Sequence, residues 1–403
     1  MLKRFAALFA AALTVGTLFC AISHTSFFSW ESIVRGKPLV FYSSTEQLKN
    51  IDFQRACYEE RVHEGDNPVL VFGSSELSPR EGSPFYPAQF WTNRNYGMNI
   101  QSEGRAYFTS LWDAVQVGAM SSYIEGDRRK VVIMPSFTWF LNATKYGNDK
   151  KQISFSRSTL DAFEETPDIP DSLKDEIRHR LEFYGVLDSV DEGFFQLDSF
   201  VDDFDESASQ SLSDINLRWK TLFEPDQVEK RNFEDEGSHS QPLPTTRFGE
   251  LETPNWDKII EDSQRRAIDK SSNEYGFEDS WYKNGFEKWL KSTEKWKVDP
   301  SNYFNENEFE EFEWFLQICR NCDIDVLVVI TPVNAKAWDL SPIGSSVRKA
   351  YYERLSSMAL EYGAALSDLS AYENDPYFCR DYHHPSEYGW SMINKAIYEF
   401  YYK

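Results

Sequence analysis

Two segments near opposite ends of this 403-residue chain carry side chains that could act together in nucleophilic catalysis. Ser74 and Ser75 follow a short apolar run and a glycine, and Asp381 precedes His384 by three residues. At this spacing the aspartate can hold one imidazole nitrogen, which leaves the other nitrogen free to take a proton from a serine hydroxyl. The residue types therefore indicate a serine nucleophile activated by a histidine base.

The first segment begins with the apolar run at residues 69–72, which Gly73 closes. A continuous apolar run of this length indicates a strand that is buried on both faces of a parallel sheet. Reactive groups of such sheets lie just beyond the carboxyl ends of the strands, where a glycine lets the backbone turn sharply. The alternative interpretation is an ordinary strand–helix turn in which Ser74 or Ser75 only caps the following helix.

The second segment contains His383 beside His384, so a metal-binding histidine pair is the alternative to a catalytic base. Consecutive side chains point in different directions, and a shared metal would need further ligands. We therefore predict no metal site here, and the sequence indicates no other cofactor.

The elements that must position these residues alternate between strands and helices. Strand–helix alternation of this kind implies an α/β fold with a parallel sheet sandwiched by helices. Gly104 stands at the expected entry of one helix, where free backbone N–H groups could face the crevice. Further strands are expected at residues 131–134, 325–330 and 364–369, and helices at residues 106–120, 307–321, 345–362 and 390–402.

Changes in composition divide the chain into four parts. Residues 1–30 are predicted to form a transmembrane signal anchor. Residues 31–155 and 303–403 are predicted to be the two parts of one α/β domain, the first with the serine segment and the second with the Asp-x-x-His segment. Residues 156–302, rich in charged and aromatic side chains, are predicted to be a helical insertion.

The anchor prediction rests on Lys3 and Arg4, which precede an apolar run at residues 5–22. This pattern is typical of a cleavable signal peptide or of an uncleaved single-pass anchor, and we favour the anchor. Phe27, Phe28 and Trp30 follow, as an interfacial aromatic belt would. The basic amino end then predicts a location at the cell membrane, with the rest of the chain on the extracytoplasmic side.

Composition and charge limit the partners. A hydrophobic fraction of 41% can support a folded core. The net charge of −23 argues against nucleic acid as a partner, because a nucleic-acid-binding protein must offer positive charge to the phosphates. The same charge is compatible with cationic or neutral ligands.

Together the two segments resemble the blocks that supply the catalytic triad in the SGNH hydrolase fold. More specifically, the chain resembles the DltD family of membrane-anchored proteins of D-alanyl-lipoteichoic acid biosynthesis. The resemblance runs from the apolar amino-terminal segment to the last expected helix. Its further blocks, in order, are residues 72–77 (FGSSEL), residues 331–338 (TPVNAKAW), Asp381-x-x-His384 and Gly389-Trp390.

By this resemblance Ser75 is the nucleophile, His384 the general base and Asp381 the residue that orients the base. Ser74 is the alternative nucleophile, because the sequence leaves the register within the serine pair open. The resemblance also implies oxyanion donors at the backbone N–H groups of Ser75 and Gly104.

One departure from the family pattern concerns a third oxyanion donor. The family usually has Ser-Pro-Gln-Trp-Phe after its next strand, whereas residues 135–140 of this chain are PSFTWF. Thr138 therefore replaces a side-chain amide with a single hydroxyl. Asn142 is the expected substitute for the missing amide.

The resemblance implies transfer of D-alanine, carried as an ester on Ser75, to lipoteichoic acid or a similar polyol-phosphate polymer outside the membrane. It also implies a D-alanyl donor and a DltB-like membrane-bound O-acyltransferase as partners. Two alternatives stay open. One is an SGNH-type esterase or O-acetyltransferase that acts on an extracellular polysaccharide. The other is a non-catalytic scaffold for a membrane acyltransferase.

Overall fold

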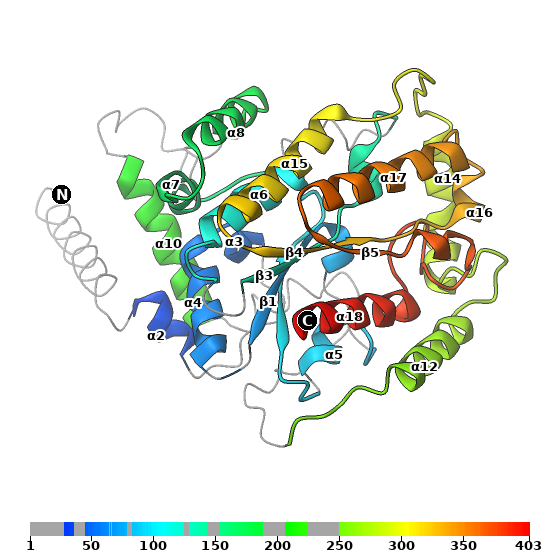
Figure 1. Cartoon of the computed structure of the whole chain (residues 1–403), viewed down its shortest axis with the longest axis horizontal. Coiled ribbons are helices and arrows are strands. Elements are labelled where there is room, and N and C mark those ends of the chain that lie inside the picture. The colour runs from blue at the N-terminus through cyan, green and yellow to red at the C-terminus, as the bar shows by residue number, and fades with distance from the viewer. Residues whose placement is uncertain are drawn as a thin grey trace, which may run out of the picture.

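A computed structural model gives the fold of the chain (Figure 1). The parts of the chain that it describes are residues 28–35, 45–63, 65, 67–78, 83–92, 94–124, 129–143, 153–187, 206–223 and 250–403.

The centre of the molecule is a parallel sheet of five strands in the order β2-β1-β3-β4-β5. The predicted α/β class and parallel sheet are thus confirmed. Strand β1 is paired on both sides, with β2 and with β3. Its carboxyl end therefore lies between the ends of two neighbouring strands. The strands are β1 Pro68–Gly73, β2 Asn99–Gly104, β3 Lys130–Ile133, β4 Asp325–Ile330 and β5 Ala365–Asp368.

Helices cover both faces of the sheet (Figure 1). Alternate side chains of β1 enter different apolar cores: Leu70 and Phe72 one core, Val69 and Val71 the other. The first core is completed by α4 Ile51–His63, α6 Ser110–Met120, α15 Glu306–Asn321 and α17 Ser345–Glu361. The second core is completed by α5 Pro87–Thr92, α12 Trp256–Asp269 and α18 Glu387–Tyr401.

The strand β2 is not expected from the sequence, because its residues NIQSEG contain no apolar run. Strand β2 pairs only with β1. One face of β2 packs against polar side chains instead of an apolar layer. Gln101 and Glu103 are buried there against Gln54 of α4 and Gln116 of α6. Gly104 therefore ends a strand, and the expectation that it stands at a helix entry is wrong.

The segment 156–302 is helical in its described parts, but its helices do not form one separate body. Helix α7 packs on α6, whereas α12 packs on α18 at the other face of the sheet (Figure 1). The predicted boundaries of this insertion stay a prediction. Its elements are α7 Arg157–Glu165, α8 Asp171–Phe183, α10 Glu206–Phe223, α12, α13 Asp279–Trp281, the π-helix η6 Tyr282–Phe286 and α14 Glu287–Thr293.

The predicted anchor lies almost entirely outside the described residues, which begin at Phe28. Within the described residues, no helix is both long and apolar enough to cross a membrane. Phe28 and Trp30 are buried, unlike members of an exposed interfacial belt. Trp30 begins α2 Trp30–Val34, packs on Phe53 of α4, and donates a hydrogen bond of 2.9 Å from Nε1 to Asp214 of α10.

Short helical turns complete the described structure, and several of them lie where a strand or a loop must change direction. They are α3 Thr45–Leu48, η2 Ser75–Leu77, η4 Phe137–Phe140, α16 Ala335–Trp338 and η7 Ser370–Asn374.

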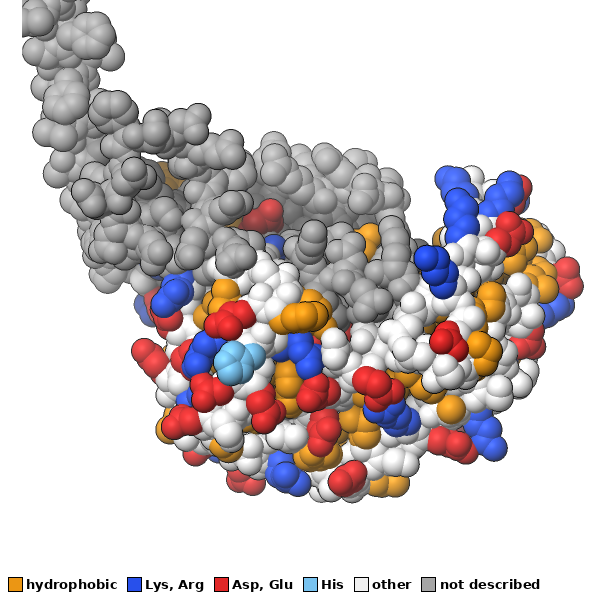
Figure 2. All heavy atoms as spheres, turned by 90° about the horizontal axis from the view of Figure 1, so that it is seen from above, with side chains coloured by type: hydrophobic (Ala, Val, Ile, Leu, Met, Phe, Trp, Pro, Cys, Tyr) orange, Lys and Arg blue, Asp and Glu red, His pale blue; other side chains and the backbone are white. Residues whose placement is uncertain are grey.

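Charged side chains of both signs are interspersed over the face of the molecule shown in Figure 2. Acidic side chains alternate there with lysine, arginine and apolar groups. On the described part of this face, the excess negative charge of the chain is therefore not gathered into a single patch.

We predict that the buried carboxyl group of Glu103 makes stability depend on pH. Burial raises the pKa of Glu103 to about 8, although hydrogen bonds from Gln101 and Gln116 act to lower it. Between the ordinary pKa of 4.5 and about 8 the unfolded chain ionises while the folded chain holds its proton, so stability falls as pH rises. Glu103→Gln removes this titration and should gain stability over the wild type, by up to about 1.4 kcal/mol per pH unit.

Urea unfolding at pH 5, 7 and 8.5 measures this difference. Glu361→Gln, at the exposed end of α17, is the matched control and should follow the wild type. Parallel profiles for Glu103→Gln and the wild type would contradict the prediction.

Candidate active site

Ser75 lies at the carboxyl edge of the sheet, where β1 ends at Gly73 and the short helix η2 begins. Its Oγ is 2.8 Å from Nε2 of His384, so the structure brings together the two predicted segments. Of the two serines, Ser75 is the one whose hydroxyl contacts the histidine.

His384 is held from behind by Asp381. The Nδ1 atom of His384 lies 2.7 Å from Oδ2 of Asp381. An ionised carboxylate can only accept hydrogen bonds, so Nδ1 carries the proton and Nε2 is left as the acceptor for the Ser75 hydroxyl. Ser75, His384 and Asp381 thus form one hydrogen-bonded chain with the polarity that serine activation requires.

Asp381 is 2% exposed, and its charge is compensated locally. Its Oδ1 accepts hydrogen bonds from the backbone N–H groups of His383 at 3.0 Å and His384 at 2.8 Å. Burial acts to raise the pKa of Asp381, but the charge and hydrogen bonds of His384 outweigh it and hold the pKa well below its ordinary value. Asp381 therefore stays ionised throughout the physiological range.

The backbone of the Asp381–His384 loop is fixed by hydrogen bonds. Tyr382 O accepts from Asn334 N at 3.0 Å and from Trp338 Nε1 at 2.9 Å. On the far side of the loop, Ser386 caps α18 by accepting from two backbone N–H groups of its first turn, and its hydroxyl donates to Tyr377 O at 2.6 Å. The loop is consequently tied down at both ends.

Ser74 has a structural role next to the candidate nucleophile. It is 2% exposed, and its Oγ accepts a hydrogen bond from Trp139 Nε1 at 3.1 Å and donates to Arg105 O at 3.3 Å. Ser74 therefore ties the turn after β1 to η4 on one side and to the end of β2 on the other.

Gly104 is paired with Gly73 across the ends of β2 and β1. A Cβ atom at position 104 would lie 2.1 Å from Gly73 O, which is far inside van der Waals contact. Glycine is therefore required for the two strands to stay together next to Ser75. The role of its N–H group as an oxyanion donor stays a prediction.

Thr138, which replaces the side-chain amide of the family pattern, and Asn142, the expected substitute for that amide, differ in position. Thr138 is buried in η4, beside the Trp139 that contacts Ser74. Asn142 instead directs its side-chain amide to Asn302 Oδ1 at 2.9 Å and to the carbonyl oxygen of Phe304. Both amide hydrogens are thereby used, so the structure does not support Asn142 as an oxyanion donor.

His383, to which the sequence gives no role, lies with its ring tilted against that of the candidate base. Its ring centroid is 3.9 Å from that of His384 and 4.2 Å from that of Tyr382. Burial lowers the pKa of His383 well below its ordinary value, so its ring is neutral beside His384.

Asp381, His383 and His384 also have possible ligand atoms within 4.8 Å of one another. Oδ2 of Asp381 and Nδ1 of His384 are already hydrogen-bonded to each other, and Nε2 of His384 faces Ser75. A metal would have to break this chain, so the arrangement favours proton transfer over coordination.

Sequence reasoning also misses Glu76, directly after Ser75. Its Oε1 accepts a hydrogen bond of 2.6 Å from the backbone N–H of Ser74. Burial raises the pKa of Glu76 to about 7, although hydrogen bonds from backbone N–H groups act to lower it. The FGSSEL block contains this glutamate, but nothing in the sequence shows that it turns back onto the serine turn.

The fold and the site together define a parallel α/β protein with a serine–histidine–aspartate chain at the carboxyl edge of its sheet. Comparison with known proteins identifies the family. A family model described as DltD protein matches residues 45–402, and the chain therefore belongs to the DltD family. The resemblance inferred from the sequence motifs is confirmed.

Two curated relatives cover most of the chain. Protein DltD of Bacillus subtilis (strain 168) is 25% identical over 356 residues, which are 87% of this chain and 86% of the relative. Protein DltD of Staphylococcus aureus (strain NCTC 8325 / PS 47) is 23% identical over 351 residues, which are 84% of this chain and 82% of the relative. The similarity thus spans both parts of the sheet and the segment between them.

We predict that Gly104→Ala separates the ends of β1 and β2 and impairs the site. Relieving the overlap with Gly73 O requires a backbone shift, which should cost about 1–3 kcal/mol of stability. The reaction of Ser75 with a serine-directed fluorophosphonate should slow at the same time. Gly344→Ala is the control, because a Cβ there meets no atom within 4 Å. A Gly104→Ala variant with wild-type stability and reactivity would show that the close approach is unimportant.

Proposed function

We propose that this DltD-family protein transfers D-alanine through an ester on Ser75 to lipoteichoic acid or a similar polyol-phosphate polymer of the cell envelope. The observation that carries the proposal is the contact of 2.8 Å between Ser75 Oγ and His384 Nε2, with Asp381 behind the histidine. The family resemblance supplies D-alanine as the acyl group and the polymer as the acceptor.

In the first step, Ser75 Oγ attacks the carbonyl carbon of the D-alanyl donor while His384 Nε2 takes the hydroxyl proton. Collapse of the tetrahedral intermediate breaks the bond to the donor's leaving group, which receives the proton from His384. Asp381 stays ionised and stabilises the imidazolium that forms between these events. The product is a D-alanyl ester on Ser75.

In the second step, a hydroxyl of the acceptor polymer attacks the ester carbonyl and gives its proton to His384. The bond to Ser75 Oγ then breaks, and His384 returns the proton to the serine. We propose the N–H groups of Ser75 and Gly104, with the Thr138 hydroxyl, as donors to the oxyanion in both steps.

The remaining parts of the proposal follow from the family resemblance and the amino-terminal sequence. The domain is of the SGNH hydrolase type, and the site faces the extracytoplasmic side. The predicted segment 1–30 anchors the domain in the cell membrane through the part that precedes Phe28, because Phe28 and Trp30 belong to the folded body. A DltB-like membrane-bound O-acyltransferase supplies the D-alanyl donor. An SGNH-type esterase or O-acetyltransferase would use the same three residues and differ only in its acyl group and acceptor.

We predict that Ser75 alone among the serines of the site is activated. Intact-mass spectrometry of the full chain after fluorophosphonate treatment should show one adduct, absent in Ser75→Ala and formed at least 100-fold more slowly in His384→Ala. Ser74→Ala should keep the adduct, because Ser74 faces Trp139 and Arg105.

The same assay separates the function classes. With an activated D-alanyl ester, the proposed transferase should accumulate a D-alanyl adduct on Ser75 that an acceptor polyol phosphate discharges. An adduct with acetyl donors only would favour the esterase or O-acetyltransferase. A folded wild-type chain without any adduct would favour the scaffold.

A further inference from the structure

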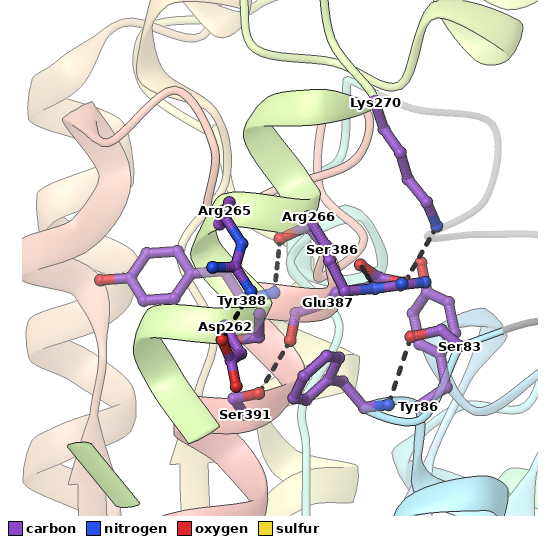
Figure 3. Close-up of polar contacts among 12 residues, drawn as sticks. Ser83, Tyr86, Asp262, Arg265, Arg266, Lys270, Ser386, Glu387, Tyr388 and Ser391 are labelled. Carbon is purple, nitrogen blue, oxygen red and sulfur yellow. Dashed lines mark hydrogen bonds and ion pairs between the residues drawn. The ribbon is translucent and has the colours of Figure 1, made fainter. Parts of the chain in front are cut away.

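The first residue of α18, Glu387, is a buried carboxylate three residues beyond His384. It is 1% exposed and receives two hydrogen bonds from Arg266, from Nε at 3.0 Å and from Nη2 at 3.1 Å (Figure 3). Lys270 Nζ adds a third at 3.0 Å. We refer to Glu387, Arg266 and Lys270 as the Glu387 cluster.

The cluster joins parts of the chain that are far apart in sequence. Arg266 lies in α12 and Lys270 directly after it, and both belong to the segment 156–302, whereas Glu387 belongs to the carboxyl-terminal part of the sheet domain. A hydrogen bond with Ser83 brings in the segment that leads from the nucleophile turn to α5. The Glu387 carboxylate therefore connects three parts of the chain: the helix that follows His384, the segment between Ser75 and α5, and the helical segment 156–302.

The charge of Glu387 is well compensated. Burial acts to raise the pKa of Glu387, but hydrogen bonds from Arg266, Ser83 and Lys270 outweigh it and hold the pKa below its ordinary value. A buried carboxylate that lost these partners would be strongly unfavourable, so the first turn of α18 stays where α12 holds it.

A second contact from the same helical segment reaches the loop directly. The backbone N–H of Glu278 donates to Arg380 O at 2.8 Å, immediately before Asp381. The Glu278 carboxylate accepts from Tyr86 OH at 3.2 Å and lies 3.9 Å from Lys270 Nζ. The Asp381–His384 loop is thus held from both ends by residues that follow or belong to α12.

We propose that Arg266 and Lys270 are positioning residues for His384, which they act on through Glu387. Only the short stretch from Pro385 to Ser386 separates His384 from the cluster, so a displacement of the first turn of α18 moves the imidazole relative to Ser75. Proton transfer over a 2.8 Å contact is sensitive to such a displacement. The inference rests on the part of the proposed function in which His384 is the base.

The neighbouring Arg265 provides a matched control. It lies on the same helix and is shown in Figure 3, but its side chain is 67% exposed and pairs only with the nearby Asp262 among the described residues. Arg265→Ala removes one positive charge from α12, as Arg266→Ala does, without touching Glu387.

The test measures the rate at which fluorophosphonate modifies Ser75 in the full chain between pH 5 and 9. The double variant Arg266→Ala/Lys270→Ala should react at least tenfold more slowly, and the pH profile of its rate should become that of His384→Ala. Arg266→Lys restores the charge but not the bidentate contact and should recover part of the rate. Arg265→Ala should match the wild type in rate and profile.

A purely structural role predicts another result. The folded fraction would fall, as a lower melting temperature would show, but the folded molecules would keep the wild-type rate and pH profile. That outcome overturns the proposal. Glu387→Gln keeps the size of the side chain and serves as a second variant if the double variant does not fold.

Proton NMR makes the test independent of the reaction. The Nδ1–H of His384, bonded to Asp381, should give a strongly downfield signal that broadens by exchange in Arg266→Ala/Lys270→Ala and persists in Arg265→Ala. An unchanged signal in the double variant overturns the positioning role whether or not Ser75 reacts. A wild type that keeps this signal but forms no D-alanyl or fluorophosphonate adduct contradicts the proposed function instead.

Discussion

The carboxylate of Asp381 accepts two backbone N–H groups and one imidazole N–H from a loop only four residues long. These bonds keep the group ionised although it is buried, and they determine the orientation of the His384 ring. The ring can face Ser75 only because β1 ends in the interior of the sheet and the chain turns there at once. The geometry of the site thus follows from one buried charge and from the place where one strand stops.

The sequence predicts those features that depend on local composition. The continuous apolar runs predict β1, β3 and β4, and the Asp-x-x-His spacing predicts the partners of the serine. The polar edge strand β2 leaves no such pattern, and its burial becomes visible only when Gln54 and Gln116 are placed beside it. The structure does not support the expected use of Asn142 for a related reason, because its contacts with residues 302 and 304 depend on tertiary structure.

The helical character of the described parts of residues 156–302 is likewise predictable, but the surfaces that these helices cover are not. An amphipathic period shows that a helix has an apolar side, without showing which neighbour that side meets. In the structure α7 supports the helix after β2, and α12 supports the helix after the histidine loop. The segment is therefore part of the framework of the site, and its described helices are spread over both faces of the sheet.

The burial of Phe28 and Trp30 bears on how far the site can reach. With the proposed anchor in a bilayer, only residues 23–27 separate its apolar run, residues 5–22, from Phe28 in the folded body. A body tethered so closely would sample a thin layer at a nearly constant height above the lipid surface. Under the proposed transfer, only polymer units that enter that layer would meet Ser75, so the length and flexibility of the acceptor, rather than of this protein, would decide which units are modified.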